Sequence, residues 1–221
     1  MSFFDIDNIF FTIWDYPVSY LEFFGLISGV VAVVLSALAN VWSWPIGIVN
    51  VVLSFFLFFQ VQLYPDMFLQ VFFFVTNLIG WWRWTHPRPF EEDRKHELKV
   101  SWMTRKEIVF VCAAGLMGTL TLGLFAENLH SFFPRVFTKP SAAPYLDSFI
   151  TAMSVITTFY LIQKKIESWI IWVVVDLIAT YLYFSRDIKL YGLLYLVLTL
   201  LAVFAVWNWI REYRSYSTQK V

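Results

Sequence analysis

Charged side chains are scarce in this sequence, and it has a single cysteine. Charged residues make up 14% of the chain and hydrophobic residues 59%, far from the balance of an average soluble domain. Basic and acidic residues are equal in number, so no basic excess is available to neutralise the phosphates of a nucleic acid. With Cys112 as the one thiol, a disulfide within the chain and a metal site built from thiolates are excluded. The composition that remains is that of a membrane protein.

Signatures of catalysis and of metal binding are missing as well. The sequence contains neither HExxH nor GxSxG, and His86, His96 and His130 have no partner at the i, i+4 spacing of a helical metal site. We therefore expect no catalytic residue, no metal and no cofactor. An intramembrane enzyme that uses Asp176 as an acid–base group stays a weaker alternative, because no second catalytic residue accompanies this aspartate.

Long apolar runs dominate the chain instead. A helix of about 20 apolar residues crosses a hydrocarbon core of about 30 Å. Seven segments fit this requirement, at approximately residues 21–41, 44–61, 66–84, 106–126, 146–163, 168–185 and 189–210. Connections within the first three and within the last three are short, while longer ones flank the fourth. We predict an all-α membrane protein with seven transmembrane helices in a 3+1+3 arrangement.

The first 20 residues precede these spans. Their apolar side chains recur at helical spacing up to Pro17, namely Ile6, Ile9, Phe10, Ile13 and Trp14. The pattern predicts an amphipathic helix that lies in the membrane interface. The segment contains no Lys or Arg, so it lacks the positive region of a signal peptide.

Lys and Arg are distributed unevenly between the predicted loops. Cytoplasmic loops hold the excess of basic residues in membrane proteins. With the N-terminus outside, 12 of the 16 basic residues fall on the inner side, namely Arg83, Arg88, Arg94, Lys95, Lys99, Arg105, Lys106, Lys164, Lys165, Arg211, Arg214 and Lys220. The distribution predicts an external N-terminus and a cytoplasmic C-terminus.

The sequence matches itself after a shift of 125 residues. The shift superposes a Ser-Trp pair and two further tryptophans, residues 43–44 on 168–169, Trp82 on Trp207 and Trp84 on Trp209. These coincidences indicate a duplicated three-helix unit. A single helix between two such units makes the repeats parallel, which is typical of transporters with a site near the membrane midplane between the repeats.

The repeat and the spans together predict the organisation of the chain. The predicted parts are an interfacial helix (1–20), a first repeat (21–84), a cytoplasmic linker with the connecting helix and an outer loop (85–145), a second repeat (146–211) and a cytoplasmic tail (212–221).

Polar and aromatic side chains share helical faces inside the predicted spans. Polar groups at membrane depth are costly and usually face the interior of the bundle. The candidates are Trp169, Trp172, Asp176, Thr180 and Tyr183 on one face of the sixth span, Asn50, Gln70, Phe74 and Asn77 in the first repeat, and Tyr195 in the seventh span. Aromatic faces can stack a planar ring, while amides, hydroxyls and a carboxylate can bind a carboxamide and a sugar. We predict that these ten residues bind a substrate with such groups.

Purely structural roles remain open for the same kinds of residue. Amides and hydroxyls can form hydrogen bonds between helices. Tryptophans near span ends are typical of interfacial belts, which applies to Trp82, Trp84, Trp207 and Trp209. Glu167 is predicted to form a surface pair with Lys164, three residues earlier.

The chain contains GWWRW at residues 80–84 and KKIESWIIWVVVD at residues 164–176, which a tyrosine-rich segment follows. These two stretches resemble the PnuC family of bacterial nicotinamide riboside transporters. The resemblance covers about residues 20 to 211 and implies a fold similar to that of SWEET sugar transporters. It also implies a homotrimer in the bacterial inner membrane. The implied activity is facilitated diffusion of the riboside, trapped by phosphorylation inside the cell, with membrane lipid as the other partner.

The resemblance leaves the exact substrate open. Similar transporters carry thiamine or riboflavin, and a proton-coupled carrier with a titrating Asp176 is a further alternative. After the shift of 125 residues Asn50 matches Val175, so Asp176 is one position out of step. The two halves therefore present different polar groups, which suits a substrate with unlike ends.

Overall fold

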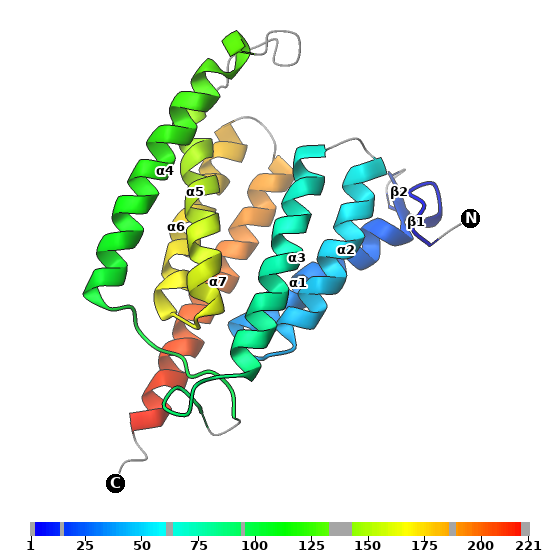
Figure 1. Cartoon of the computed structure of the whole chain (residues 1–221). Helices are drawn as coiled ribbons and strands as arrows, with labels where there is room; N and C mark the ends of the chain where they lie inside the picture. Colours follow the sequence, from blue (N-terminus) through cyan, green and yellow to red (C-terminus); the bar gives the residue numbers. More distant parts are fainter. Residues whose placement is uncertain are drawn as a thin grey trace. The chain divides into compact units, whose positions relative to one another are not determined.

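The chain is predominantly helical in the computed structural model, which describes residues 3–13, 16–60, 64–93, 96–132, 143–185 and 189–217 (Figure 1). This part of the chain contains seven helices, α1 (Tyr20–Ala37), α2 (Ser43–Gln60), α3 (Tyr64–Thr85), α4 (Arg105–Phe132), α5 (Pro144–Ile162), α6 (Ile166–Ser185) and α7 (Lys189–Ser217). Each coincides with one predicted segment, so the prediction of a helical fold is confirmed. The chain divides into two compact units, Met1–Lys99 and Val100–Val221.

Six of these helices are long and apolar enough to cross a membrane. Among the described residues they are Tyr20–Ala37, Ser43–Gln60, Arg105–Asn128, Pro144–Ile162, Glu167–Ser185 and Gly192–Tyr216. The remaining helix, α3, carries Gln70, Asn77 and three tryptophans, which lower its hydropathy. The chain is therefore a multi-pass membrane protein with at least six helices of membrane-spanning character.

The N-terminal segment is a β-hairpin, so the prediction of an amphipathic helix over residues 1–20 is wrong. Strands β1 (Ile9–Ile13) and β2 (Tyr16–Ser19) pair antiparallel. The β-branched and aromatic residues of β1 favour a strand. The helix begins only at Tyr20, because Ser19 and Glu22 form a capping box that starts α1. Trp14, which belonged to the predicted helical pattern, lies outside the described residues, as does Asp15.

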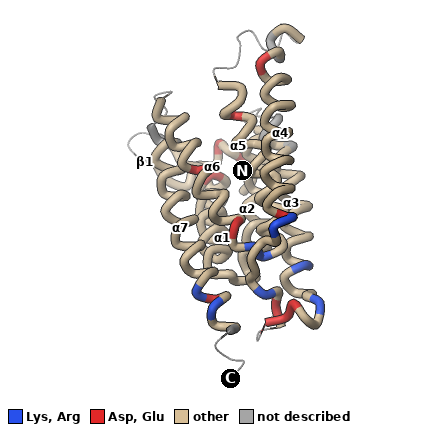
Figure 2. The backbone as a smooth tube through the Cα atoms, turned by 90° about the vertical axis from the view of Figure 1, so that its left-hand side faces the viewer, with Lys and Arg blue, Asp and Glu red and all other residues tan. Residues whose placement is uncertain are grey.

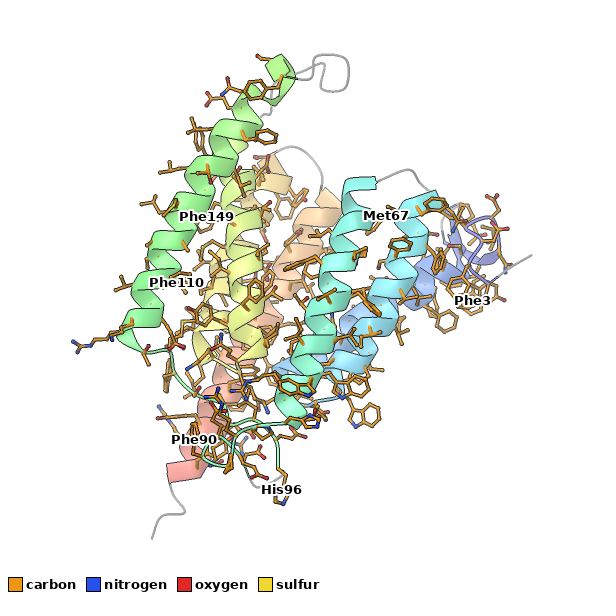
Figure 3. The ribbon with its side chains drawn as sticks, viewed as in Figure 1. Phe3, Met67, Phe90, His96, Phe110 and Phe149 are labelled. Atoms are coloured by element: carbon orange, nitrogen blue, oxygen red, sulfur yellow. The ribbon has the colours of Figure 1, made fainter. Side chains whose placement is uncertain are left out.

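Within the first unit, the N-terminal segment with its hairpin packs on α1 and α2 through aromatic rings and one glutamine. Phe10 contacts Tyr20 and Phe23 at centroid distances of 4.6 and 5.1 Å, and Phe3, labelled in Figure 3, lies beside them. At the end of α2, the Gln60 side-chain amide binds the segment before β1 through both its nitrogen and its oxygen. It donates to the carbonyl of Phe4 (2.6 Å) and accepts the N–H of Ile6 (3.0 Å).

The turns α1–α2 and α5–α6 have the same backbone structure. Ala39 and Lys164, 125 residues apart, both adopt the left-handed conformation, with φ of 53° and 55°. In each turn the left-handed residue donates its N–H to a carbonyl three residues earlier, and the next residue donates to a carbonyl five residues earlier. This is the Schellman arrangement, which satisfies the last carbonyls of a helix.

Basic residues gather at one end of the second unit, as the blue segments of the backbone show (Figure 2). They lie at the start of α4, in the α5–α6 turn and near the end of α7, and comprise Arg105, Lys106, Lys164, Lys165, Arg211 and Arg214. Acidic Glu127 and Asp147 lie near the opposite ends of α4 and α5. Six of the basic residues used to predict orientation lie outside the described residues, namely Arg94, Lys95, Arg135, Lys139, Arg186 and Lys220.

Candidate functional site

Asp176 is a buried carboxylate in the middle of α6. Its exposed fraction is 4%, and no hydrogen bond or ion pair to its carboxylate is found among the described residues. The nearby Thr180 hydroxyl donates to the backbone carbonyl of Asp176 (2.7 Å) and not to its side chain. A carboxyl group without a partner at this depth is costly. Such a group marks a place that a cationic or hydrogen-bonding ligand can complete.

Trp169 lies about two helical turns before Asp176. It packs edge-on against Trp209 of α7. The ring centroids are 5.8 Å apart and the planes meet at 84°. The indole Nε1 of Trp169 is buried and has no hydrogen-bond partner within the described chain. Because a buried donor without an acceptor is costly, this N–H is a second polar group on the face that a ligand can satisfy.

Trp172 lies between these two residues along α6 and is half-buried. It packs against a hydrophobic cluster made of Met103, Val111, Met153, Tyr160 and Val175. The cluster draws on the segment before α4 and on α4, α5 and α6. Trp172 is thus fixed from the α5 side of α6, whereas Trp169 is fixed by α7.

Tyr183 and Tyr195 form an aromatic pair at the other end of α6. Their rings are stacked at 5.2 Å with an angle of 13° between planes, which joins α6 to α7. Trp169 and Tyr183 are fourteen residues apart on α6, or about 21 Å at 1.5 Å per residue. A small ligand cannot reach both ends at once, so the tyrosine pair belongs to a different level of this face from Trp169 and Asp176.

In the first unit, Asn50 and Asn77 are both tied to backbone. The Asn50 amide donates to the carbonyl of Gly25 in α1 (2.7 Å), which is the interhelical role that competed with substrate binding. The Asn77 amide donates to Phe73 in its own helix (2.7 Å). Its Oδ1 packs so closely on Gly47 that a Cβ there would lie 2.3 Å away. Each amide uses one of its two N–H donors on a backbone carbonyl, and the second N–H and the oxygen are left for another partner.

Gln70 and Phe74 line a cavity of about 200 Å³ between α2 and α3. The other lining residues are Val51, Val52, Phe55, Phe56 and Val71, so Gln70 carries the polar group. Pockets that enclose small ligands usually measure roughly 300 to 1,000 Å³. The cavity by itself is too small for a ring with an attached sugar, and Asn50 and Asn77 do not line it.

Trp44 is a site candidate that the sequence reasoning missed. It packs edge-on against Trp84 at 5.2 Å and 89°, and its Nε1 is likewise buried and unpaired within the described residues. This pair lies 125 residues before Trp169 and Trp209. The repeated Ser-Trp motif was the signal that could have identified it. The ring needs Gly80, where a Cβ would lie 2.4 Å from it.

The tryptophans near the helix ends divide into two classes. Trp84 and Trp209 are fully buried, whereas Trp82 and Trp207 are 62% and 57% exposed. The interfacial-belt prediction is wrong for the buried pair, because these rings contact protein and not the membrane surface. Two residues correspond to about 200° around a helix, so neighbouring tryptophans in WRW and WNW point in opposite directions.

The predicted surface pair of Glu167 and Lys164 is also wrong. Lys164 is fully buried in the turn before α6. Both carboxylate oxygens of Glu167 lie 2.9 Å from the backbone nitrogen of Met103, whose N–H they accept. Glu167 therefore binds the chain that leads into α4.

Comparisons with known proteins identify a family and similar transporters. The family described as nicotinamide mononucleotide transporter matches residues 19–211. The nicotinamide riboside transporter PnuC of Escherichia coli (strain K12) is 28% identical, with 97% of each chain covered. The riboflavin/roseoflavin transporter RibM of Streptomyces davaonensis is 22% identical over 90% of this chain and 88% of its own. A crystal structure of the vitamin B3 transporter PnuC is similar in fold, with a TM-score of 0.64 and 20% identity, covering 89% of this chain and 83% of the other.

Proposed function

Because the chain belongs to the nicotinamide mononucleotide transporter family, we propose that it is a membrane transporter for the uptake of nicotinamide riboside. The observation that carries the proposal is the buried Asp176, whose carboxylate has no partner among the described residues. Nicotinamide riboside bears a positively charged pyridinium ring, and a buried carboxylate beside tryptophans suits such a cation electrostatically. The name of the Escherichia coli relative supports the same substrate.

The charge pattern favours the riboside over its phosphorylated form. Helices α5 and α6 contain no Lys or Arg, although phosphate recognition normally uses such side chains. A phosphate near Asp176 would also meet a like charge. The substrate therefore enters without its phosphate.

Each candidate residue has a chemical role in this proposal. Asp176 faces the pyridinium charge, Trp169 and Trp172 hold the ring, and Thr180 lies on the same face. The carboxamide or ribose contacts the first unit during passage, through the amide oxygens of Asn50 and Asn77 and through the Gln70 amide, which Phe74 accompanies. The stacked Tyr183 and Tyr195, about 10 Å from Asp176 along α6, line the path and do not bind together with Trp169.

The wider architecture is part of the proposal. Helices α1–α3 and α5–α7 are a duplicated unit joined by α4, and all seven helices span the membrane as in SWEET transporters. The matched Schellman turns and matched tryptophan pairs support the duplication. The protein is a homotrimer of the bacterial inner membrane with its C-terminus in the cytoplasm. Transport is facilitated diffusion, and phosphorylation in the cell retains the riboside.

Riboflavin transport is the second candidate. The observation in its favour is the similarity to RibM over nearly the whole chain. Flavin is a larger and uncharged ring system, so it gains nothing from the charge of Asp176. Competition between the two substrates separates the candidates.

Uptake by purified protein in liposomes tests the proposal. Labelled nicotinamide riboside should accumulate to equilibrium without an ion gradient, and unlabelled riboside should compete better than riboflavin, thiamine or the mononucleotide. Uptake of labelled riboflavin without uptake of labelled riboside would overturn the proposed substrate. Uptake that requires an imposed pH gradient would overturn facilitated diffusion in favour of proton coupling.

A further inference from the structure

The segment 100–104, here called the strap, crosses the turn between α5 and α6. Ser101 forms a parallel bridge with Lys165. Its N–H donates to the carbonyl of Lys164 (3.1 Å), and its own carbonyl accepts the N–H of Ile166 (3.0 Å). In Figure 1 the chain leading into α4 runs past this turn. The strap thus adds a short piece of strand pairing to a turn between two helices.

Two charged side chains of the turn fasten the strap. Glu167 accepts the Met103 N–H with both oxygens (2.9 Å each). Lys165 reaches the other way and donates its Nζ to the carbonyl of Trp102 (3.2 Å) and to Glu107 (3.5 Å). Hydrogen bonds to ionised groups are stronger than those between neutral groups. The KKIE motif is therefore a fastening for this segment.

Met103 connects the strap to the candidate site. Its side chain is buried and belongs to the cluster against which Trp172 packs. Phe149 of α5, labelled in Figure 3, packs against the same cluster. Val175, the residue before Asp176, is also a member. A shift of Met103 therefore changes the support of Trp172 and of the α6 backbone next to Asp176.

Within the described residues, no segment pairs in this way with the equivalent turn of the first unit. The position 125 residues before Glu167 is Trp42, which is 62% exposed, and its N–H is accepted by Asn40 Oδ1 within the turn (2.9 Å). The Schellman turn forms there without help. The strap is thus unnecessary for the turn itself, and its presence on α6 calls for another explanation.

We propose that Glu167 is a positioning residue, which holds Met103 so that Trp172 and Asp176 keep the geometry that binds substrate. The inference rests on the proposed function, because it assigns Glu167 a part in riboside binding without contact to the riboside. Loss of the fastening loosens Met103, and the face on α6 then binds its ligand less tightly.

The test combines hydrogen exchange with riboside binding in the full-length protein. Glu167→Gln keeps the side-chain shape and removes the charge. We expect exchange of the amides at 101–103 to accelerate at least tenfold and the Kd for nicotinamide riboside to rise about tenfold. Glu212→Gln is the matched control, since Glu212 lies at the same end of the unit and its carboxylate accepts the Tyr216 hydroxyl (3.2 Å) and no backbone N–H of the strap. It should change neither quantity.

A second variant separates the fastening from the contact it supports. Met103→Ala keeps the backbone N–H, so the strap should stay protected from exchange, while the lost side chain should raise the Kd several-fold. In the double variant, the Kd should rise by less than the product of the two single fold-changes, because both substitutions act on Trp172. Thr158→Ala, a buried α5 substitution outside the strap, reports what mild destabilisation alone does to the Kd.

Two results would overturn the inference. One is an unchanged exchange rate in Glu167→Gln, which means that the carboxylate does not hold the strap. The other is faster exchange with unchanged Kd, or a Kd change no larger than that of Thr158→Ala. Wild-type protein that binds riboflavin and not the riboside contradicts only the proposed substrate, and the variant ratios are then measured with riboflavin.

Discussion

The α1–α2 and α5–α6 hairpins share a turn but carry different additions. In the first unit the N-terminal hairpin packs at the start of α1 and the end of α2. In the second unit the strap packs at the end of α5 and the start of α6. The two additions therefore lie at opposite ends of their helical hairpins. The common turn and tryptophan pair belong to the fold, while the additions distinguish the two halves.

The polar groups of the halves differ in the same way. Asn50 and Asn77 each use one amide N–H on a backbone carbonyl, whereas Asp176 has no such partner among the described residues. Gly47 faces Asn77 in the first unit, and the positions 125 residues later hold Trp172 and Ala202. The larger side chain of this pair of positions is on the third helix of the first unit (Asn77 in α3) and on the second helix of the second unit (Trp172 in α6). The second half thus concentrates charge and aromatic surface on α6.

The largest effect is expected from removing the charge of α6. Asp176→Asn should lower the rate of riboside uptake at limiting concentration by about a hundredfold, since an interaction with a charged group contributes roughly 1.5 to 3 kcal/mol. The same variant should unfold at an equal or higher temperature, because a buried carboxylate without a partner is costly. Uptake by proteoliposomes and thermal unfolding in detergent measure the two effects.

Asp147→Asn is the control for this prediction. Asp147 lies in the first turn of α5, at the end of the second unit opposite the α5–α6 turn. Uptake should stay close to that of the wild type. Equal losses in both variants would show that general electrostatics, and not the position on α6, controls transport.

The tryptophan pairs should respond differently to a change of one methyl group. Gly80→Ala places a Cβ 2.4 Å from the Trp44 ring, and overpacking of this kind costs about 1 to 3 kcal/mol. The equivalent residue in the second unit is Ala205, which is fully buried. Ala205→Gly should cost only about 0.5 to 1 kcal/mol, through helix propensity and a small void. Thermal unfolding of both variants tests the order, and a larger loss for Ala205→Gly would contradict it.

The N-terminal addition can be released by one substitution. Gln60→Ala removes two hydrogen bonds to the segment before β1 and should cost about 1 kcal/mol. Amide exchange over residues 3–8 should accelerate, while exchange in α5–α7 stays unchanged. Gln163→Ala is the matched control, because among the described residues the Gln163 side chain makes only a long contact to Phe159 (3.5 Å). Slow exchange that persists in Gln60→Ala would mean that the aromatic contacts suffice.

Helix positions could be predicted from the sequence because apolar length alone determines them in a membrane protein. The N-terminal segment could not, because residues 9–13 fit a helical and an alternating pattern at once, and the Ser19 cap decided between them. The face of Asp176 followed from helical spacing. The contacts of Glu167 did not, since its partner Met103 is 64 residues away in sequence. Burial of Trp84 was equally invisible, because end position alone does not give orientation around the helix.

The smallest expected effect concerns the turn that both halves share. A left-handed residue other than glycine costs roughly 1 kcal/mol, so Ala39→Gly should stabilise the protein by up to about that amount, less the added entropy of the unfolded chain. Lys164→Gly relieves the same backbone cost but removes a fully buried side chain, and it should destabilise the protein. Thermal unfolding of the two variants compares them directly. Equal stabilisation by both would mean that the Lys164 side chain contributes nothing, and the turns would then differ only through Glu167 and the strap.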